Sequence, residues 1–320
     1  YVICFIYFSI YFNNYLIEKT KRLEYVGITN EWLIDNFYLL VEHKTDIIND
    51  KKIIDRRLKK SDTLYLCLKS IVEKGNYNVS FKYLVTELKK YQKDTSKYFS
   101  YQEIANIRNI LIFVYTGRLK KLCDEELSKL LSGDKIKKII SSLSDKELTL
   151  KDFITEEFDI EKNHHYLYEL NSQLKELGSK SNSLFKELNE FLKERQVSLK
   201  EIINDEHQTR IENDLLIANI FNDLRNFFEL SVEDLYEKVS RAEKILLGDK
   251  VYGKMTVESK ELYRRQVEKL AKKNRCSEVE YLNKLLDKTG LDDYHIGFQL
   301  FKNKDKRLSI ASLTKMVAQI

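Results

Sequence analysis

The chain contains no proline in its 320 residues, and this absence limits the possible folds more than any other feature of the sequence. Average proteins contain roughly 5% proline and roughly 7% glycine, whereas this chain has only 9 glycines. Proline interrupts helices because its ring blocks the helical hydrogen bond, and glycine is the usual residue of tight turns. The sequence therefore predicts long helices with few and short connections.

Helix starts are indicated by a Ser or Thr followed three residues later by an acidic residue, because the two side chains can bind backbone amides of the first turn. The pairs that fit are Ser100/Glu103, Ser144/Glu147, Thr149/Asp152, Ser198/Glu201, Ser231/Asp234 and Ser277/Glu280. Apolar residues recur at spacings of three and four between several of these starts. The two clearest series are Ile104, Ile107, Leu111, Val114, Leu122 and Leu216, Ile220, Leu224, Phe227. We predict an all-α fold, a multi-helix array of antiparallel helices with short loops in two helical subdomains.

The segment 167–191 has leucines at alternating spacings of four and three, which is typical of a coiled coil. Gly178 and the polar residues that follow it favour a break instead, because glycine commonly ends a helix and serine or asparagine begins the next. We favour a hairpin of two antiparallel helices and keep a continuous coiled coil as the alternative.

The expected domain order follows from one polar segment, "SGDKIKKIISSLSDKELT", which has capping residues at both ends. We expect a helical unit over 1–132, a connecting segment over 133–150 and a second helical unit over 151–290. Residues 291–320 would lead toward a following region. Since the sequence starts without methionine and stops within a helical pattern, we expect it to be part of a longer protein.

Neither the net charge nor the cysteine spacing indicates a particular function. The 55 basic and 50 acidic residues give a net charge of +5, a mixed surface that does not require a nucleic-acid partner. The four cysteines are far apart and include no C-x-x-C pair, so neither a zinc site nor a disulfide framework is indicated. They are Cys4, Cys67, Cys123 and Cys276.

The opening run "YVICFIYFSIYFNNYLI" is the only strongly apolar stretch. It is shorter than the roughly 20 residues of a membrane span and is interrupted by Ser9, Asn13 and Asn14. We interpret it as an aromatic-rich core helix, with the end of a membrane helix and a processed signal as alternatives.

Residues 248–255, "GDKVYGKM", match the phosphate-loop pattern G-x-x-x-x-G-K. A phosphate loop needs Ser or Thr after the lysine to hold magnesium, but Met255 stands there and Thr256 comes one residue too late. Such a loop also follows a buried strand, whereas the preceding residues have helical spacing. We interpret this segment as an interhelical turn.

Metal-ligand patterns are weak as well. His164 and His165 are adjacent and point to different sides of a helix, and the consecutive residues 205–207 cannot converge on one helical face. "LDDYH" at 291–295 combines two acids with a histidine, but acids are common in loops after glycine. We expect structural or solvated roles for these residues, and we assign no catalytic, cofactor-binding or metal-ligating residue.

A cationic cluster follows residue 261. Its members are Arg264, Arg265, Lys269, Lys272, Lys273 and Arg275, arranged around an apolar face of Leu262, Tyr263, Val267, Leu270 and Ala271. Because Glu258, Glu261 and Glu268 are interleaved with the cations, we favour a solvated helix with internal ion pairs. Binding of a polyanion through this cluster is the alternative, and it would weaken steeply with added salt.

Four segments taken in order have the letters and spacing of one known family. They are "EWLIDNFYLLVEH" (31–43), "IINDEHQTRIENDLLIANIFNDLR" (202–225), "VYGKMTVESKELYRRQVEKLAKKNRCSE" (251–278) and "HIGFQL" (295–300). The third is similar to a pattern of Val-Tyr, Met, Thr-Arg, Tyr-Arg and Val-Glu, and the fourth to His-Val-Gly-Tyr-Tyr-Leu. Together they resemble the region that precedes the membrane-embedded glycosyltransferase of cyclic β-1,2-glucan synthases.

That resemblance implies a large bacterial inner-membrane enzyme, of which this chain is a helical accessory region on the cytoplasmic side. Members of the family polymerise glucose from UDP-glucose and cyclise the product. The sugar nucleotide and a divalent metal would bind at aspartate motifs beyond residue 320, so no catalytic residue can be placed in this sequence. The expected partners are the downstream membrane and transferase domains of the same chain. The alternative is a non-enzymatic helical module that binds another protein or its own copies.

Overall fold

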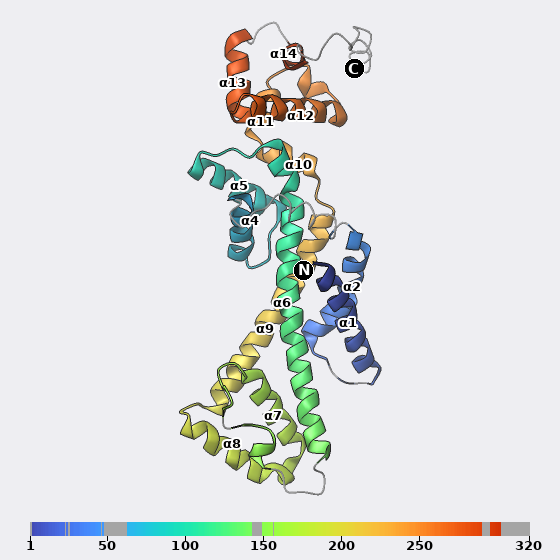
Figure 1. Cartoon of the computed structure of the whole chain (residues 1–320), viewed down its shortest axis with the longest axis vertical. Coiled ribbons are helices and arrows are strands. Elements are labelled where there is room, and N and C mark those ends of the chain that lie inside the picture. Colours follow the sequence, from blue (N-terminus) through green and yellow to red (C-terminus); the bar gives the residue numbers. More distant parts are fainter. Residues whose placement is uncertain are drawn as a thin grey trace. The chain divides into compact units, whose positions relative to one another are not determined.

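The chain was analysed as a computed structural model, which describes residues 2–22, 24, 26–45, 47, 63–142, 149–155, 157–289 and 295–301. Every regular element in these residues is a helix, and they include no strand (Figure 1). The prediction of an all-α fold with many helices is therefore confirmed. The capping pair Ser144/Glu147 lies outside the described residues.

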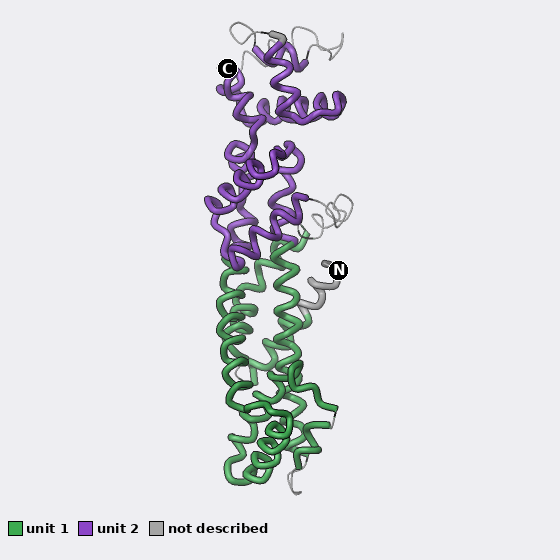
Figure 2. Tube along the Cα trace, turned by 90° about the vertical axis from the view of Figure 1, so that its left-hand side faces the viewer, with its two compact units in different colours: residues 1–49, 114–222 green, residues 50–113, 223–320 purple. Residues whose placement is uncertain are grey.

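The helices form two compact units, and each unit is built from two separate stretches of chain (Figure 2). Unit 1 comprises residues 1–49 and 114–222, and unit 2 comprises residues 50–113 and 223–320. This division differs from the linear one expected around a connecting segment at 133–150. The physical reason is that residues 133–142 continue a helix: Ile136 is fully buried and keeps the helical spacing past Gly133.

Unit 1 contains the following elements: α1 (Val2–Lys21), α2 (Ile28–Glu42), the part of α6 (Tyr101–Ser142) from Val114 onward, the 3₁₀ turn η1 (Leu150–Asp152), α7 (His164–Glu176), the 3₁₀ turn η2 (Gly178–Ser181), α8 (Asn182–Glu194) and the part of α9 (Leu199–Phe228) up to Asn222. The opening apolar run forms α1, in which Phe12 and Leu16 are buried. In the part of the chain that the structure describes, no helix is both long enough and apolar enough to span a membrane.

The segment 167–191 forms the predicted hairpin. Gly178 adopts φ +62° directly after α7, a left-handed conformation that glycine reaches without steric cost. The Ser181 hydroxyl lies 2.6 Å from the Leu174 carbonyl and 2.8 Å from the Gly178 carbonyl, and its one hydrogen bonds to these acceptors and closes the turn. Apolar residues of α7 and α8 then pack into one cluster with the end of α6 and the start of α9.

Unit 2 contains the following elements: α4 (Thr63–Lys74), α5 (Phe81–Thr95), the first part of α6, the end of α9, α10 (Val232–Val239), α11 (Arg241–Leu246), the 3₁₀ turn η3 (Tyr252–Lys254), α12 (Val257–Lys273), α13 (Glu278–Thr289) and α14 (Ile296–Phe301). Ser100 with Glu103 and Ser277 with Glu280 form the predicted reciprocal caps at the starts of α6 and α13. The apolar residues predicted to lie in the core of α6 and α9 are buried.

Candidate functional site

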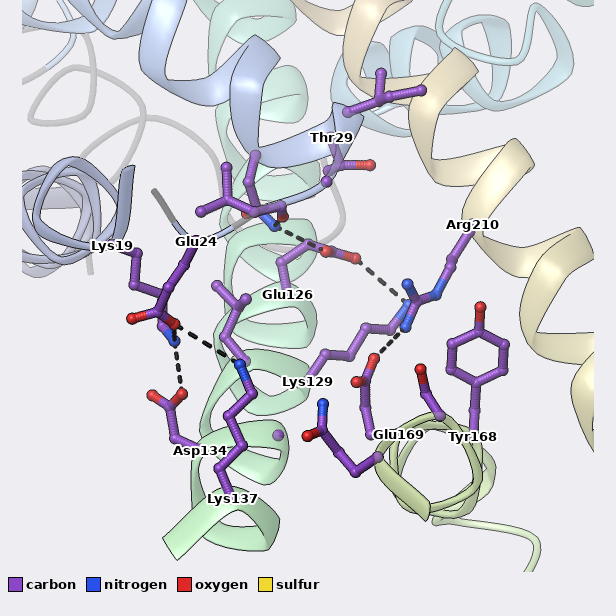
Figure 3. A pocket seen from close by; sticks show the side chains of 18 of the residues that line it. Lys19, Glu24, Thr29, Glu126, Lys129, Asp134, Lys137, Tyr168, Glu169 and Arg210 are labelled. Carbon is purple, nitrogen blue, oxygen red and sulfur yellow. Dashed lines mark hydrogen bonds and ion pairs between the residues drawn. The ribbon is translucent and has the colours of Figure 1, made fainter. Parts of the chain in front are cut away.

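Unit 1 contains a cavity of about 480 Å³, lined by the end of α1, the start of α2, and α6, α7 and α9. Its lining is charged and polar (Figure 3). The charged residues of the lining are Lys19, Glu24, Glu126, Lys129, Asp134, Lys137, Glu169, Glu176, Arg210 and Asp214. Six carboxylates thus face four cations.

One wall of the cavity is organised by Lys19. Its ammonium lies 3.0 Å from a carboxylate oxygen of Glu24 and 2.6 Å from one of Asp134. The Tyr15 hydroxyl donates a second hydrogen bond of 2.6 Å to Asp134. Burial acts to raise the pKa of Asp134, but the hydrogen bonds from Lys19 and Tyr15 outweigh it and lower that pKa. This carboxylate is therefore ionised at neutral pH.

The opposite wall joins α6, α7 and α9. The Arg210 guanidinium donates hydrogen bonds to Glu169 (2.6 Å) and Glu206 (3.1 Å) and lies over the Tyr168 ring, 4.3 Å from its centroid. The Lys129 ammonium lies 3.0 Å from Glu206. These ion pairs tie the helices together around the cavity and satisfy most of the charges that face it.

The first turn of α2 forms a third side. Gly27 precedes it with φ +88°, a conformation that favours glycine, and it supplies no side chain to cap the helix. The Thr29 hydroxyl donates a 2.6 Å hydrogen bond to Asp214. Asn30 is 1% exposed, and its Nδ2 donates to the Val26 carbonyl at 2.7 Å. The carboxylate of Glu126 also accepts from this Nδ2, at 3.3 Å.

The histidines considered in the sequence lie near this region without converging. His165 Nε2 is 3.3 Å from the Ser132 hydroxyl, and burial lowers its pKa. His164 Nδ1 is 3.9 Å from the exposed Asp205, and His207 contacts the edge of the Tyr168 ring. Among the described residues, no three His, Cys, Asp or Glu side chains are grouped so that they could hold a metal ion.

Unit 2 has a buried cluster around Arg264, which we call the Arg264 cluster (Arg264, Glu233, Glu243, Tyr252). The guanidinium binds Glu243 at 2.6 and 3.0 Å and Glu233 at 2.6 and 2.7 Å. The side chains of Arg264 and Glu243 are both 0% exposed. Burial alone would lower the pKa of Arg264, but the two carboxylates raise it above its usual value.

The sequence-based interpretation of the cationic cluster is therefore wrong for Arg264, which is internal rather than solvated. Two of its neighbours do form the expected ion pairs, Arg265 with Glu261 and Lys272 with Glu268. Leu262 was expected on the apolar face but is 49% exposed. The helix is rotated so that Arg264 takes part in the buried face beside Tyr263, Val267 and Ala271.

A second cluster in unit 2 joins Asp249, His295 and Tyr263, and we call it the Asp249 cluster. Asp249 Oδ2 lies 2.9 Å from His295 Nδ1, and His295 Nε2 lies 2.8 Å from the Tyr263 hydroxyl. Since an ionised carboxylate only accepts, Nδ1 carries a hydrogen, and in the neutral imidazole Nε2 accepts from the tyrosine. The Asp249 carboxylate also accepts the amides of Val251, Tyr252 and Ile296.

The Asp249 cluster has the order of an acid–base relay, but its tyrosine is not activated. Burial, together with the charge of Asp249, raises the pKa of Tyr263 to about 12, so the hydroxyl keeps its proton at neutral pH. Burial acts to raise the pKa of Asp249, yet its amide and histidine hydrogen bonds lower it. The cluster therefore holds the turn before α12 and the start of α14 together rather than exposing a nucleophile.

Two segments considered in the sequence analysis, 248–255 and 291–295, contribute residues to the Asp249 cluster. Residues 248–255 form a turn between α11 and α12 that includes η3, which confirms the interhelical interpretation. Thr256 caps α12, since the Ser259 amide donates to its hydroxyl. Of "LDDYH", residues 291–294 lie outside the described part, and His295 binds Asp249 of that turn.

Glu278, at the start of α13, is a buried acid with one unpaired oxygen. It is 6% exposed, Oε1 accepts the Tyr101 amide at 2.8 Å, and Oε2 has no hydrogen-bond partner among the described residues. Burial raises its pKa to about 7, and the charges of Glu268 and Glu103 add to this effect. The ionised form is thus disfavoured in the folded protein.

We expect Glu278 to make the protein less stable as the pH rises from 4.5 to about 7. In that window the folded state binds the proton more tightly than the unfolded state, so the stabilising effect of protonation is complete below it and lost above it. Urea unfolding of the wild type and of Glu278→Gln at pH 5 and pH 8 measures this. Relative to the wild type, the free energy of unfolding of the variant should be higher at pH 8 than at pH 5. The same difference between variant and wild type at both pH values would contradict the assignment.

No family model matches the chain, and no curated protein matches it.

Proposed function

We propose that the chain is an accessory region of a cyclic β-1,2-glucan synthase-type glycosyltransferase, which organises the enzyme and does not itself transfer sugar. The supporting observation is that the third and fourth resembling segments (251–278 and 295–300) contact one another, in part through letters they share with that family. The shared residues Tyr263 and His295 bind each other, and the side-chain Nε2 of Gln266, which is not a shared letter, donates to the Leu300 carbonyl at 2.9 Å.

The position of the shared residues is what gives this observation weight. Tyr252, Tyr263, Arg264 and Leu300 are buried, and Gly297 lies against the Tyr263 hydroxyl and the His295 ring. A chance likeness between two charged helices would fall on exposed positions as often as on buried ones. Here Val251 is 37% exposed, but most of the shared letters named above are buried and pack α12 and α14 together, which favours a common structural unit.

In this proposal the parent protein polymerises glucose from UDP-glucose at the cytoplasmic face of a bacterial inner membrane. Its divalent metal and sugar nucleotide bind in a transferase domain downstream of residue 320. The helical units described here are partners of that domain and of the membrane helices in the same chain. Nucleic acid has no role in it.

The first test is the coding sequence beyond residue 320. It should encode several apolar spans followed by separated aspartate motifs, and an early stop codon would contradict the proposal. Membranes from cells that express the full gene should then incorporate labelled glucose from UDP-glucose into a cyclic glucan. Membranes with the downstream aspartates replaced by alanine are the matched control.

A non-enzymatic interaction module is the second candidate, and one surface feature favours it. Ile211 and Leu215 lie one turn apart on the unit 1 part of α9 and are 63% and 57% exposed. Two large apolar side chains on adjacent turns are suited to contact another helix. Sedimentation velocity measures the oligomeric state of the purified wild-type chain and of the double variant Ile211→Asp/Leu215→Asp. If this role is right, the wild type should self-associate and the variant should not.

A further inference from the structure

We propose that the unit 1 cavity binds a small, neutral, polyhydroxylated molecule of mono- or disaccharide size. This inference does not rest on the proposed function, because it concerns α2, α6, α7 and α9 and uses none of the contacts between α12 and α14. Three observations support it: the size of the cavity, the pairing of its charges, and two buried polar atoms of its lining, on α2 and α6, that have no hydrogen-bond partner among the described residues.

The size of the cavity fits a small ligand. Its volume of about 480 Å³ falls within the roughly 300–1,000 Å³ of small-molecule sites. Most such sites are lined mainly by apolar groups, but this one is lined mostly by charged side chains together with Tyr168, Ser172 and Gln173, and its apolar side chains are Val26, Ile28 and Leu130. A lining of that kind favours a ligand that forms many hydrogen bonds.

The charges of the cavity favour a neutral ligand. Lys19, Lys129 and Arg210 each have a carboxylate partner within 3.0 Å. An anionic ligand would have to compete with these resident carboxylates. A cationic ligand would meet Lys137, whose side chain is 51% exposed and lies 3.9 Å from its nearest acid, together with the positive end of the α2 dipole. Hydroxyl groups can use the remaining lone pairs and N–H groups without breaking an ion pair.

Two side chains of the lining supply an unsatisfied acceptor and an unsatisfied donor. Asn30 Oδ1 is buried and has no hydrogen-bond partner among the described residues. Its amide orientation is fixed, because both neighbours of Nδ2 are acceptors, the Val26 carbonyl and Glu126. Lys129 Nζ is also buried and makes no hydrogen bond among the described residues, although it lies 3.0 Å from Glu206 and 3.4 Å from Glu126.

A hydroxyl group satisfies both requirements at once. It can donate its hydrogen to Asn30 Oδ1 and accept from Lys129 Nζ, whereas a carboxylate or phosphate could serve only the lysine and an ammonium ligand only the oxygen. Asn30 and Lys129 both line the cavity, so a ligand inside it contacts both side chains. This pairing of donor and acceptor selects a polyol over an ion.

Isothermal titration calorimetry of the purified chain tests the ligand class directly. Glucose and sucrose are the neutral probes, and glucosamine and glucose 6-phosphate are the cationic and anionic comparators with the same ring. We expect saturable binding of at least one neutral probe and binding that is weaker by about tenfold or more for both charged ones. No binding of either neutral probe at about 10 mM, or tighter binding of a charged one, would overturn the proposal.

The site is tested with a pair of glycines on α6. A Cβ at Gly133 would meet only a Glu169 oxygen at 3.8 Å, and Gly133 lines the cavity, so Gly133→Leu places its side chain there without a backbone clash. Gly117 is a helical glycine of the same unit with nothing within 4 Å, so Gly117→Leu is the matched control. Leucine favours the helix at both positions, and both variants should therefore fold.

We expect Gly133→Leu to weaken binding of the neutral probe by at least about tenfold and Gly117→Leu to leave it unchanged. The amide signals of Ile28 and Thr29 in the wild type should also shift during the titration, which locates the ligand without a variant. Equal affinities for the two leucine variants, or unchanged signals for both amides at saturation, would place the ligand elsewhere and overturn the assignment.

Discussion

Replacing Arg264 by alanine should lower the free energy of unfolding of unit 2 by about 3–5 kcal/mol, the usual cost of leaving a buried charge without its partner. The reason is Glu243, whose side chain is 0% exposed and binds Arg264 through both carboxylate oxygens. Without the guanidinium, Glu243 keeps only polar contacts such as the Tyr252 hydroxyl at 2.7 Å. Urea denaturation followed by circular dichroism measures the change.

The adjacent arginine is the matched control for this prediction. Arg265 is 66% exposed and pairs with Glu261 one turn earlier, so Arg265→Ala should cost no more than about 1 kcal/mol. The double variant Arg264→Met/Glu243→Gln removes both fully buried charges and should be more stable than Arg264→Ala, because the carboxylate left without the guanidinium is then only that of Glu233, which is 27% exposed and reaches water. Equal costs for Arg264→Ala and Arg265→Ala would contradict the burial of this ion pair.

Replacing Gly297 by alanine should also destabilise the protein, by about 1–3 kcal/mol, which is typical of overpacking a closed site. Alanine ordinarily favours a helix relative to glycine, so the sign of the effect is diagnostic. A Cβ at this position would lie 2.3 Å from the Tyr263 hydroxyl and 2.6 Å from His295 Nε2. It would therefore force apart the hydrogen bond between those two side chains.

Gly253→Ala is the control for Gly297→Ala, since a Cβ at Gly253 would have nothing within 4 Å. Its effect on the free energy of unfolding should stay within about 0.5 kcal/mol. In the background of Tyr263→Phe, which removes the clashing hydroxyl, Gly297→Ala should cost less than in the wild type. A stabilising effect of Gly297→Ala in the wild type would show that the Asp249 cluster is not packed as described.

Features that depend on local sequence could be predicted here, and features that depend on distant partners could not. The caps at Ser100 and Ser277 and the turn at Gly178 involve residues within a few positions of one another, and each formed as expected. Arg264 has the same local surroundings as the exposed Arg265. What distinguishes it is Glu233 and Glu243, which are 31 and 21 residues away and come from other helices.

The cavity of unit 1 was missed for the same reason. Its lining comes from helices between Lys19 and Asp214, and in the sequence each of its charged residues looks like an ordinary solvated side chain. The "NDEHQTR" segment shows the limit clearly. Glu206 and Arg210 are partners one helical turn apart, which spacing could suggest, but the contacts of Glu206 with Lys129 and of Arg210 with Glu169 require the fold.

The alternation of the two units along the chain sets the order in which they can be completed during synthesis. Residues 1–49 begin unit 1, but its second stretch starts only at residue 114 and ends at residue 222, within α9. By then residues 50–113 of unit 2 have already left the ribosome, and their partners after residue 223 have not been made. Helix α5 contacts both α4 and α10, so the face of α5 that packs against α10 stays uncovered while unit 1 is completed. A ribosome that pauses once residue 222 has left its exit tunnel would hold a chain with unit 1 complete and unit 2 incomplete, a state in which a chaperone has an apolar surface to bind.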